Sequence, residues 1–194
     1  MIKKIVVGSV LASSLVFASN NSAQININNN TLEVAGDIFL NDSYNLNDDS
    51  NYFLTARYLT SDEGNSKVSS QKLLTTGFKI VNPYIDDKGF SLGMGIDAVW
   101  ADNYSKTFYA VALKISGKYM INEQLSTDLE IGYSPKVITY GDGDNFKSGQ
   151  IKLNYKIIDN GYIYVGARSI TTNYKDGTDV DFDSSAFFGY KVTF

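Results

Sequence analysis

The chain has 194 residues, with no cysteine, no histidine and a formal net charge of -4. The lack of histidine excludes Ser–His and Cys–His catalytic pairs and imidazole metal sites, and the acidic balance argues against a nucleic-acid partner. Without cysteine the chain forms no disulfide and is not a lipoprotein acylated on cysteine.

The N-terminal segment, residues 1–18, has the features of a secretory signal peptide. A basic head at residues 3–4 precedes an apolar run at residues 5–17, and Ala18 ends a stretch suited to signal peptidase. A retained membrane anchor is the alternative, although the run is short for a membrane helix. Cleavage removes two lysines and leaves one domain, residues 19–194, with a net charge of -6 (-4 minus 2).

Nine segments of the remaining chain alternate apolar and polar residues with a period of two. This period is typical of β-strands that have one apolar face. Both prolines, Pro83 and Pro135, fall between segments, as expected for residues that a central strand does not tolerate. In chain order the segments are 32–40, 52–58, 74–80, 90–100, 109–119, 125–133, 151–157, 163–168 and 186–194.

Bacterial barrels made from one chain have an even number of strands. The stretch from Gln24 to Asn28 also alternates and supplies a tenth strand, with Asn29 and Asn30 as the turn. We therefore predict an all-β fold, a transmembrane antiparallel up-and-down β-barrel of ten strands. Eight strands, with the first segments folded elsewhere, is the alternative.

A soluble β-sandwich would show the same alternation, so the period alone does not separate it from a membrane barrel. The apolar faces are bracketed by aromatic residues, because Phe90 and Trp100 are ten residues apart and so are Tyr109 and Tyr119. Ten tilted residues rise roughly 25 Å, the height of the lipid-facing band of a barrel. The polar faces mix small residues with charges of both signs, which suits a crowded barrel interior.

The chain ends on its last predicted strand, with Phe194 on the apolar face and Phe187 as an exception on the polar face. Resemblance to bacterial outer-membrane barrels implies that the assembly machinery reads such a terminal aromatic residue. We therefore take Phe194 as the candidate assembly signal and the barrel assembly machinery as an expected partner. Membrane lipid and lipopolysaccharide are the other expected partners, in the outer membrane of a Gram-negative bacterium.

The connecting segments differ in length at the two predicted ends of the barrel. Residues 82–89, 122–124 and 159–161 are short, as periplasmic turns are. The longer polar segments are expected to be outer loops, together with a short one at residues 101–106. These longer segments are 60–72, 134–144 and 171–183.

The charged residues on the polar faces are the candidate functional residues of the lumen. Eight cations and five acids leave an excess of three positive charges. One interpretation is a closed network of ion pairs, with Arg57 and Arg168 as its anchors; the other is a narrow polar path that slightly prefers anions. The set comprises Glu33, Asp37, Arg57, Lys79, Asp97, Lys114, Lys118, Asp128, Glu130, Lys152, Lys156, Arg168 and Lys191.

Two acidic patterns in the sequence are candidate chemical sites. Asp128 and Glu130 share one face and formally allow paired-carboxylate catalysis, but pairing with lumen lysines is the favoured interpretation. Asp142 and Asp144 flank Gly143 in an outer segment, a weak calcium pattern for which solvated loop charge is the favoured interpretation. We expect no catalytic residue, no metal site and no cofactor.

Three motifs resemble the YfaZ family of small outer-membrane proteins. They are Tyr133-Ser134-Pro135, residues 166–170 (Gly-Ala-Arg-Ser-Ile) and residues 188–194 (Phe-Gly-Tyr-Lys-Val-Thr-Phe). The resemblance implies an outer-membrane barrel and no established activity. The sequence therefore favours a structural or narrow-channel role. A surface-binding, adhesin-like barrel that acts through its outer loops is the alternative, and a lipid-modifying enzyme is disfavoured by the missing histidine.

Overall fold

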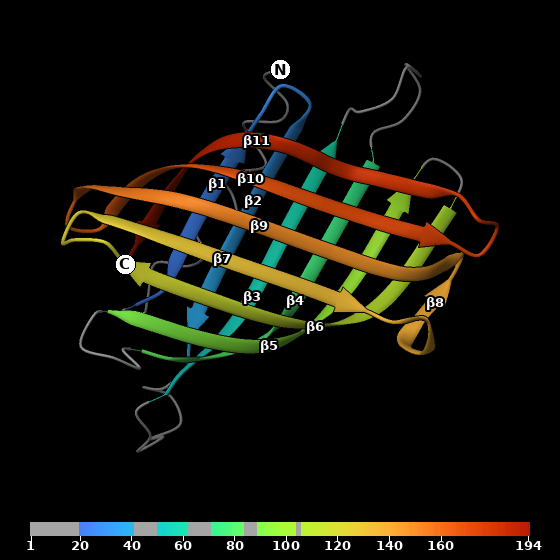
Figure 1. Cartoon of the computed structure of the whole chain (residues 1–194), viewed down its shortest axis with the longest axis horizontal. Coiled ribbons are helices and arrows are strands. Elements are labelled where there is room, and N and C mark those ends of the chain that lie inside the picture. Colours follow the sequence, from blue (N-terminus) through green and yellow to red (C-terminus); the bar gives the residue numbers. More distant parts are fainter. Residues whose placement is uncertain (1–19, 41–49, 62–70, 84–88, 104–105) are drawn as a thin grey trace.

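The computed structural model describes residues 20–40, 50–61, 71–83, 89–103 and 106–194. These residues form an antiparallel barrel in which ten strands close into one ring, as predicted, and β8 is a short additional strand (Figure 1). No helix in the described part of the chain is long and apolar enough to cross a membrane. The strands are β1 (Ser22–Ile27), β2 (Thr31–Phe39), β3 (Asn51–Ser61), β4 (Gln71–Asn82), β5 (Phe90–Asn103), β6 (Lys106–Met120), β7 (Leu125–Ser134), β8 (Thr139–Gly141), β9 (Gly143–Ile158), β10 (Gly161–Tyr174) and β11 (Asp179–Thr193).

The first and last strands close the ring. Six residue pairs join β1 to β11, from Ser22 opposite Thr193 to Ile27 opposite Phe188. Beyond them, the Asn20 amide donates to the Phe194 carbonyl at 2.6 Å, and the Phe194 amide donates to the Asn21 carbonyl at 2.9 Å. The predicted tenth strand at the start of the chain is therefore required to satisfy the edge of β11.

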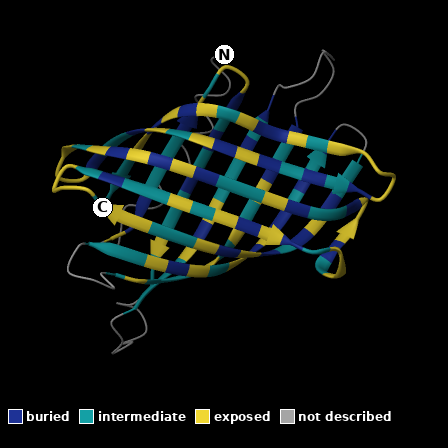
Figure 2. Ribbon diagram, in the orientation of Figure 1, coloured by how far each residue is buried: buried dark blue, intermediate teal, exposed yellow. Residues whose placement is uncertain are grey.

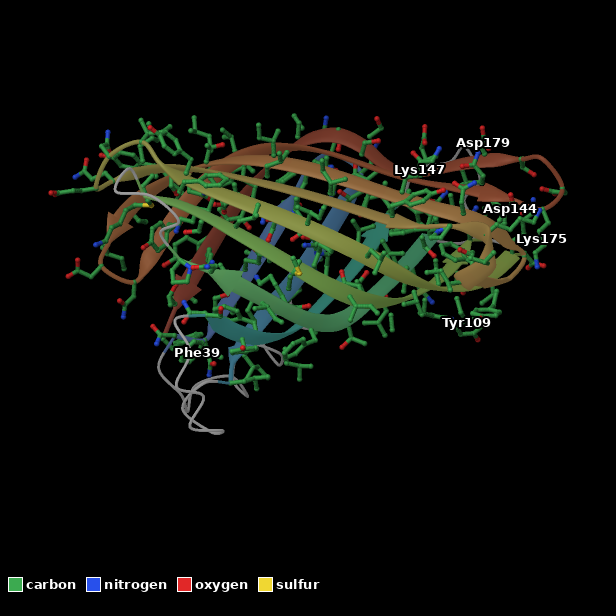
Figure 3. All side chains as sticks on the ribbon, turned by 60° about the horizontal axis from the view of Figure 1, so that its bottom comes forward. Phe39, Tyr109, Asp144, Lys147, Lys175 and Asp179 are labelled. Carbon is green, nitrogen blue, oxygen red and sulfur yellow. The ribbon has the colours of Figure 1, made fainter. Side chains whose placement is uncertain are left out.

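We call the end of the barrel that carries Asn20, Phe194 and the turns at residues 121–124 and 159–160 the inner end. The opposite end, which carries β8 and the turn at residues 175–178, is the outer end. Figure 3 shows Phe39 at the inner end and Lys175 at the outer end.

The apolar faces point out of the ring. Leu113, Ile131 and Leu153 are 59%, 54% and 43% exposed, so they do not gather in a central core. Exposed and buried residues alternate along every long strand, which gives the chequered pattern of Figure 2. Phe187, the exception in the last strand, follows this alternation because its ring is buried in the lumen.

The prediction of one outer loop over residues 134–144 is wrong. β7 stops at Ser134, a 3-10 turn follows at Lys136–Ile138, and β8 then takes the place of β7 beside β6. The hydroxyl groups of Ser134 and Thr139 lie 2.9 Å apart and bridge this interruption. Gly141 has a φ of 75°, a conformation that favours glycine, where the chain turns from β8 into β9.

The prediction of a loop over residues 171–183 is also wrong, because β10 continues to Tyr174 and β11 already begins at Asp179. The strands persist because their inward residues there, Ile170, Tyr174 and Phe182, bury apolar side chains in the lumen. Residues 62–70 of the predicted outer loop, residues 84–88 of the predicted inner turn and the predicted signal peptide lie outside the described residues. No group of three acidic side chains in the described part of the chain could hold a metal ion.

Because the apolar faces of the strands point into lipid, a charge introduced there is expected to lower the free energy of unfolding. The loss should be largest near the bilayer midplane. Ile115 lies midway between Tyr109 and Tyr119 on β6 and is 62% exposed. The Ile115→Arg substitution is expected to lower the free energy of unfolding in liposomes by about 2–4 kcal/mol, because the charge lies near the bilayer midplane. Urea titration followed by Trp100 fluorescence measures the change.

The matched control is Val137→Arg in the 3-10 turn at the outer end, where the expected loss is less than about 1 kcal/mol. An equal loss for the two variants would contradict the assigned lipid-facing band.

Candidate functional site in the barrel lumen

The lumen is built in three layers, and the layer at the outer end is apolar. Phe108 of β6 lies at its centre, with ring centroids 6.1 Å from Phe146, 6.0 Å from Tyr174 and 6.3 Å from Phe182. Seven strands contribute side chains, so the rings fill the space between opposite walls. This apolar layer comprises Leu59, Leu73, Val99, Ala101, Phe108, Ala110, Ala112, Phe146, Ile170, Tyr174 and Phe182.

Below it lies a layer organised by Arg168 of β10, which is buried. Its guanidinium pairs with Asp183 of β11, from Nε at 2.9 Å and from Nη2, and with Glu33 of β2. Thr31 donates to the same Asp183 carboxylate at 3.1 Å. We call this set the arginine layer. A buried charge is tolerated only when it is paired, and here two carboxylates surround one guanidinium.

Tyr164 of β10 extends this layer towards the barrel seam. Its hydroxyl donates to the Asn26 side-chain carbonyl, and the Asn26 amide donates to Glu33. The Tyr164 ring covers Gly189, its partner on β11, where an added Cβ would clash with the ring. Only glycine therefore lets the ring lie against β11, and the layer links β1, β2, β10 and β11.

Phe187 completes the arginine layer from β11. Its ring stands edge-on to Tyr164 with centroids 6.3 Å apart, and the Arg168 guanidinium carbon lies 5.0 Å from its centroid. A guanidinium over an aromatic face gains cation–π stabilisation in a site with little water. The inward position of Phe187 is explained by this contact.

The third layer is a cavity of about 480 Å³ towards the inner end, which we call the vestibule. Three ion pairs join different strands of its wall. Arg57 pairs with Glu130 at 2.9 Å, Lys114 pairs with Asp97 at 2.7 Å, and Lys79 pairs with Asp37 at 3.6 Å. Arg57 also lies 3.8 Å from Glu33, so it joins the vestibule to the arginine layer.

Four more charged residues line the vestibule without such a pair among the described residues. Lys118 and Lys152 each lie beside Asp128 in the strand register, but neither forms an ion pair with it. The Lys152 ammonium instead donates to the side-chain carbonyl of Gln24 at 3.0 Å and lies 5.1 Å from the Tyr164 ring centroid. Lys191 of β11 also lines this space.

The remaining predicted lumen residue, Lys156, lies near the inner end of β9. It pairs with Asp159 of the adjoining turn at 3.1 Å and is absent from the vestibule lining. Sequence reasoning missed Asp183, which was assigned to a loop. Counting back from Thr193, every second residue faces inward, and Asp183 falls on that series. The arginine layer and the vestibule together therefore carry seven cations and six carboxylates, not the predicted eight and five.

The apolar layer was also missed, although the sequence contains a signal for it. Residues 98–101, Ala-Val-Trp-Ala, are apolar on both faces, a pattern expected where a strand contacts lipid outside and a packed interior inside. The inward pair Val99 and Ala101 lies in the apolar layer, whereas Trp100 faces outward.

Polar contacts tie the turns at the outer end together. Lys106 pairs with Asp176, and Lys175 donates to the Gly141 carbonyl at 2.7 Å. Hydrogen bonds from Lys106 and Thr178 lower the pKa of the Asp176 carboxyl below its ordinary value. Lys136 pairs with Asp144 at 2.7 Å. The carboxylate that the sequence offers as a candidate calcium ligand therefore forms an ion pair with a lysine.

A closed antiparallel ring with an apolar outer surface and charged residues in its lumen defines an integral β-barrel of the outer membrane of Gram-negative bacteria. The chain belongs to the YfaZ family, because the family model described as YfaZ precursor matches residues 2–194. A precursor description agrees with the signal peptide that the sequence predicts.

Comparison with solved structures finds other outer-membrane barrels. The outer membrane channel DcaP of Acinetobacter baumannii matches with a TM-score of 0.42 and 15% identity, over 84% of this chain and 51% of that one. The outer-membrane expressed OmpT of Vibrio cholerae matches with a TM-score of 0.39 and 14% identity, over 88% of this chain and 64% of that one. The chain thus spans half to two thirds of the length of these proteins. No curated protein matches the sequence.

The arginine layer predicts a large cost for removing its cation. Arg168→Met is expected to lower the free energy of unfolding by about 3–5 kcal/mol, because Glu33 and Asp183 would remain buried without their partner. Denaturant titration of the refolded barrel measures this cost.

Lys156→Met is the matched control, since its partner Asp159 is fully exposed, and its expected effect is below about 1 kcal/mol. Adding Glu33→Gln and Asp183→Asn to Arg168→Met should recover part of the loss. A stable single variant would show that Arg168 is not an anchor.

Proposed function

We propose that this protein is a non-enzymatic, structural barrel of the outer membrane whose lumen is closed towards the outer end. The observation that carries this proposal is the apolar layer, in which Phe108, Phe146 and Phe182 meet across the lumen and are buried. An ion or polar solute would have to shed its water to pass between these rings. A narrow channel, the other role that the sequence left open, would require this layer to move.

Two further features support a structural role. The arginine layer joins four strands on both sides of the β1–β11 seam, where closure depends on the shortest of the ten ring strands. The carboxylates Asp128 and Glu130 formally allow paired-carboxylate catalysis. They do not act as a pair, because Glu130 accepts a hydrogen bond from Arg57. Catalysis by the pair would need both carboxyl groups free to exchange protons.

We infer that the inner end faces the periplasm. The turns at residues 121–124 and 159–160 are short, whereas the outer end carries β8, the 3-10 turn and the extended β10–β11 hairpin. In this orientation Lys136 lies towards the outer leaflet and supplies a cation for lipopolysaccharide phosphates, while Phe194 is presented to the assembly machinery at the periplasmic face.

The closed lumen predicts the electrical behaviour of the purified barrel. The native protein is expected to give no current steps above background in planar bilayers. The double variant Phe108→Ser, Phe182→Ser should give steps, because it removes two rings of the apolar layer while retaining the arginine layer.

The matched control is Phe188→Ser, whose ring faces lipid on β11. Steady steps from the native protein, as large as those of the double variant, would overturn the proposal and favour a channel.

The proposed assembly signal predicts different effects for two outward phenylalanines of one segment. Phe194→Ser is expected to reduce the folded fraction in the outer membrane several-fold, because the assembly machinery would no longer read the last residue. Phe188→Ser, six residues earlier, should reduce it less. Heat-modifiable gel mobility of the membrane fraction measures both, and equal folded fractions would count against a special role for Phe194.

A further inference from the structure

The vestibule is lined by more positively charged side chains than its ion pairs neutralise. Six cations and four carboxylates line it, and the three pairs described above use three of each. Lys118, Lys152 and Lys191 therefore remain (6 minus 3), against the single carboxylate of Asp128 (4 minus 3). Asp128 can neutralise one of these lysines, and Glu33, the excess carboxylate of the adjoining arginine layer, can offset a second charge, which leaves one positive charge unbalanced.

The lysines that remain lie within electrostatic reach of one another. All three line the same cavity, and Lys118 and Lys152 flank Asp128 from the two neighbouring strands in the register. Neither Lys118 nor Lys191 has a hydrogen bond or an ion pair to any residue that the structure describes. Repulsion between like charges inside a confined space is relieved most directly when an anion binds between them.

Lys152 adds a buried donor to the same space. Its side chain is 7% exposed, yet the Gln24 carbonyl and the face of the Tyr164 ring are its described contacts, and both are neutral. An ammonium taken out of water is stabilised much more by a negative partner than by neutral ones. The free donor capacity of Lys152 points to a ligand in the vestibule.

We infer that the vestibule binds a small organic anion through Lys118, Lys152 and Lys191. Lysine ammonium groups act as point charges that suit carboxylate and phosphate groups alike, so these two chemistries define the ligand class. The volume of about 480 Å³ is that of a small-molecule site. Neutral polar side chains in the wall, including Ser126 and Asn154, offer hydrogen bonds to the remainder of such a ligand.

The excess of lysines in the vestibule does not depend on whether the barrel conducts ions. The proposed closed lumen decides only the side from which the anion enters, which would be the periplasm. Binding can therefore be measured on the folded barrel in a zwitterionic detergent, where failure of the anion site and failure of the proposed function give different results.

Isothermal titration calorimetry of the mature barrel at low salt, with citrate and separately with pyrophosphate, tests the inference. At least one anion should bind saturably, and comparison of the two shows whether the site prefers carboxylate or phosphate. Lys118→Gln and Lys191→Gln should each weaken binding about tenfold or more, since each removes a charge-assisted contact. Glycerol, a neutral polyol, should not bind.

Lys147→Gln is the matched control, because Lys147 is exposed on the outside of β9 near the outer end (Figure 3). It should leave the affinity unchanged, and Trp100 fluorescence should show that every variant is folded. Absence of saturable binding of both anions to the native barrel would overturn the inference. So would an equal loss of affinity in Lys147→Gln, which would indicate binding to general surface charge.

Discussion

Peptide groups that cross hydrocarbon have no water to bond with, so every strand of this protein depends on a neighbour on each side. Among the ten ring strands, β1 is the shortest, and it offers only six residue pairs to β11. The arginine layer lies beside this seam and connects β2, β10 and β11 through one guanidinium. Side-chain pairing thus reinforces the place where backbone pairing is least extensive.

The side chains that fill the lumen differ in polarity and in packing along its length. The apolar layer holds aromatic rings from opposite walls, the arginine layer holds a buried cation between two carboxylates, and the vestibule holds charges that are incompletely paired. Exclusion of water increases the strength of each electrostatic contact as well as the cost of each unmatched charge. The vestibule is consequently the region where an external anion would gain most, whereas the side chains of the other two layers are packed or paired with one another.

The two ends of the barrel differ because the strands differ in height. β9, β10 and β11 continue beyond the lipid-facing band, with polar residues such as Thr171 and Asp181 outside and apolar residues inside. Hydrogen bonds between outward side chains and a packed interior together keep these extensions in strand form. The interrupted wall at β7 and β8 lies at the same end, where Pro135 cannot donate to the sheet.

Periodicity determined much of this architecture, because a residue two positions along a strand returns to the same face. Parity placed Leu113 towards lipid and Arg57 towards the lumen, and the even-number rule required the strand before Leu32. Parity does not say which inward residues meet across the ring. Partners such as Arg168 and Glu33 are 135 positions apart in the sequence, and only the closed ring brings them together. The same closure brought Phe108 against Phe182, so the tertiary structure alone decided that apolar side chains pack together in the outer part of the lumen.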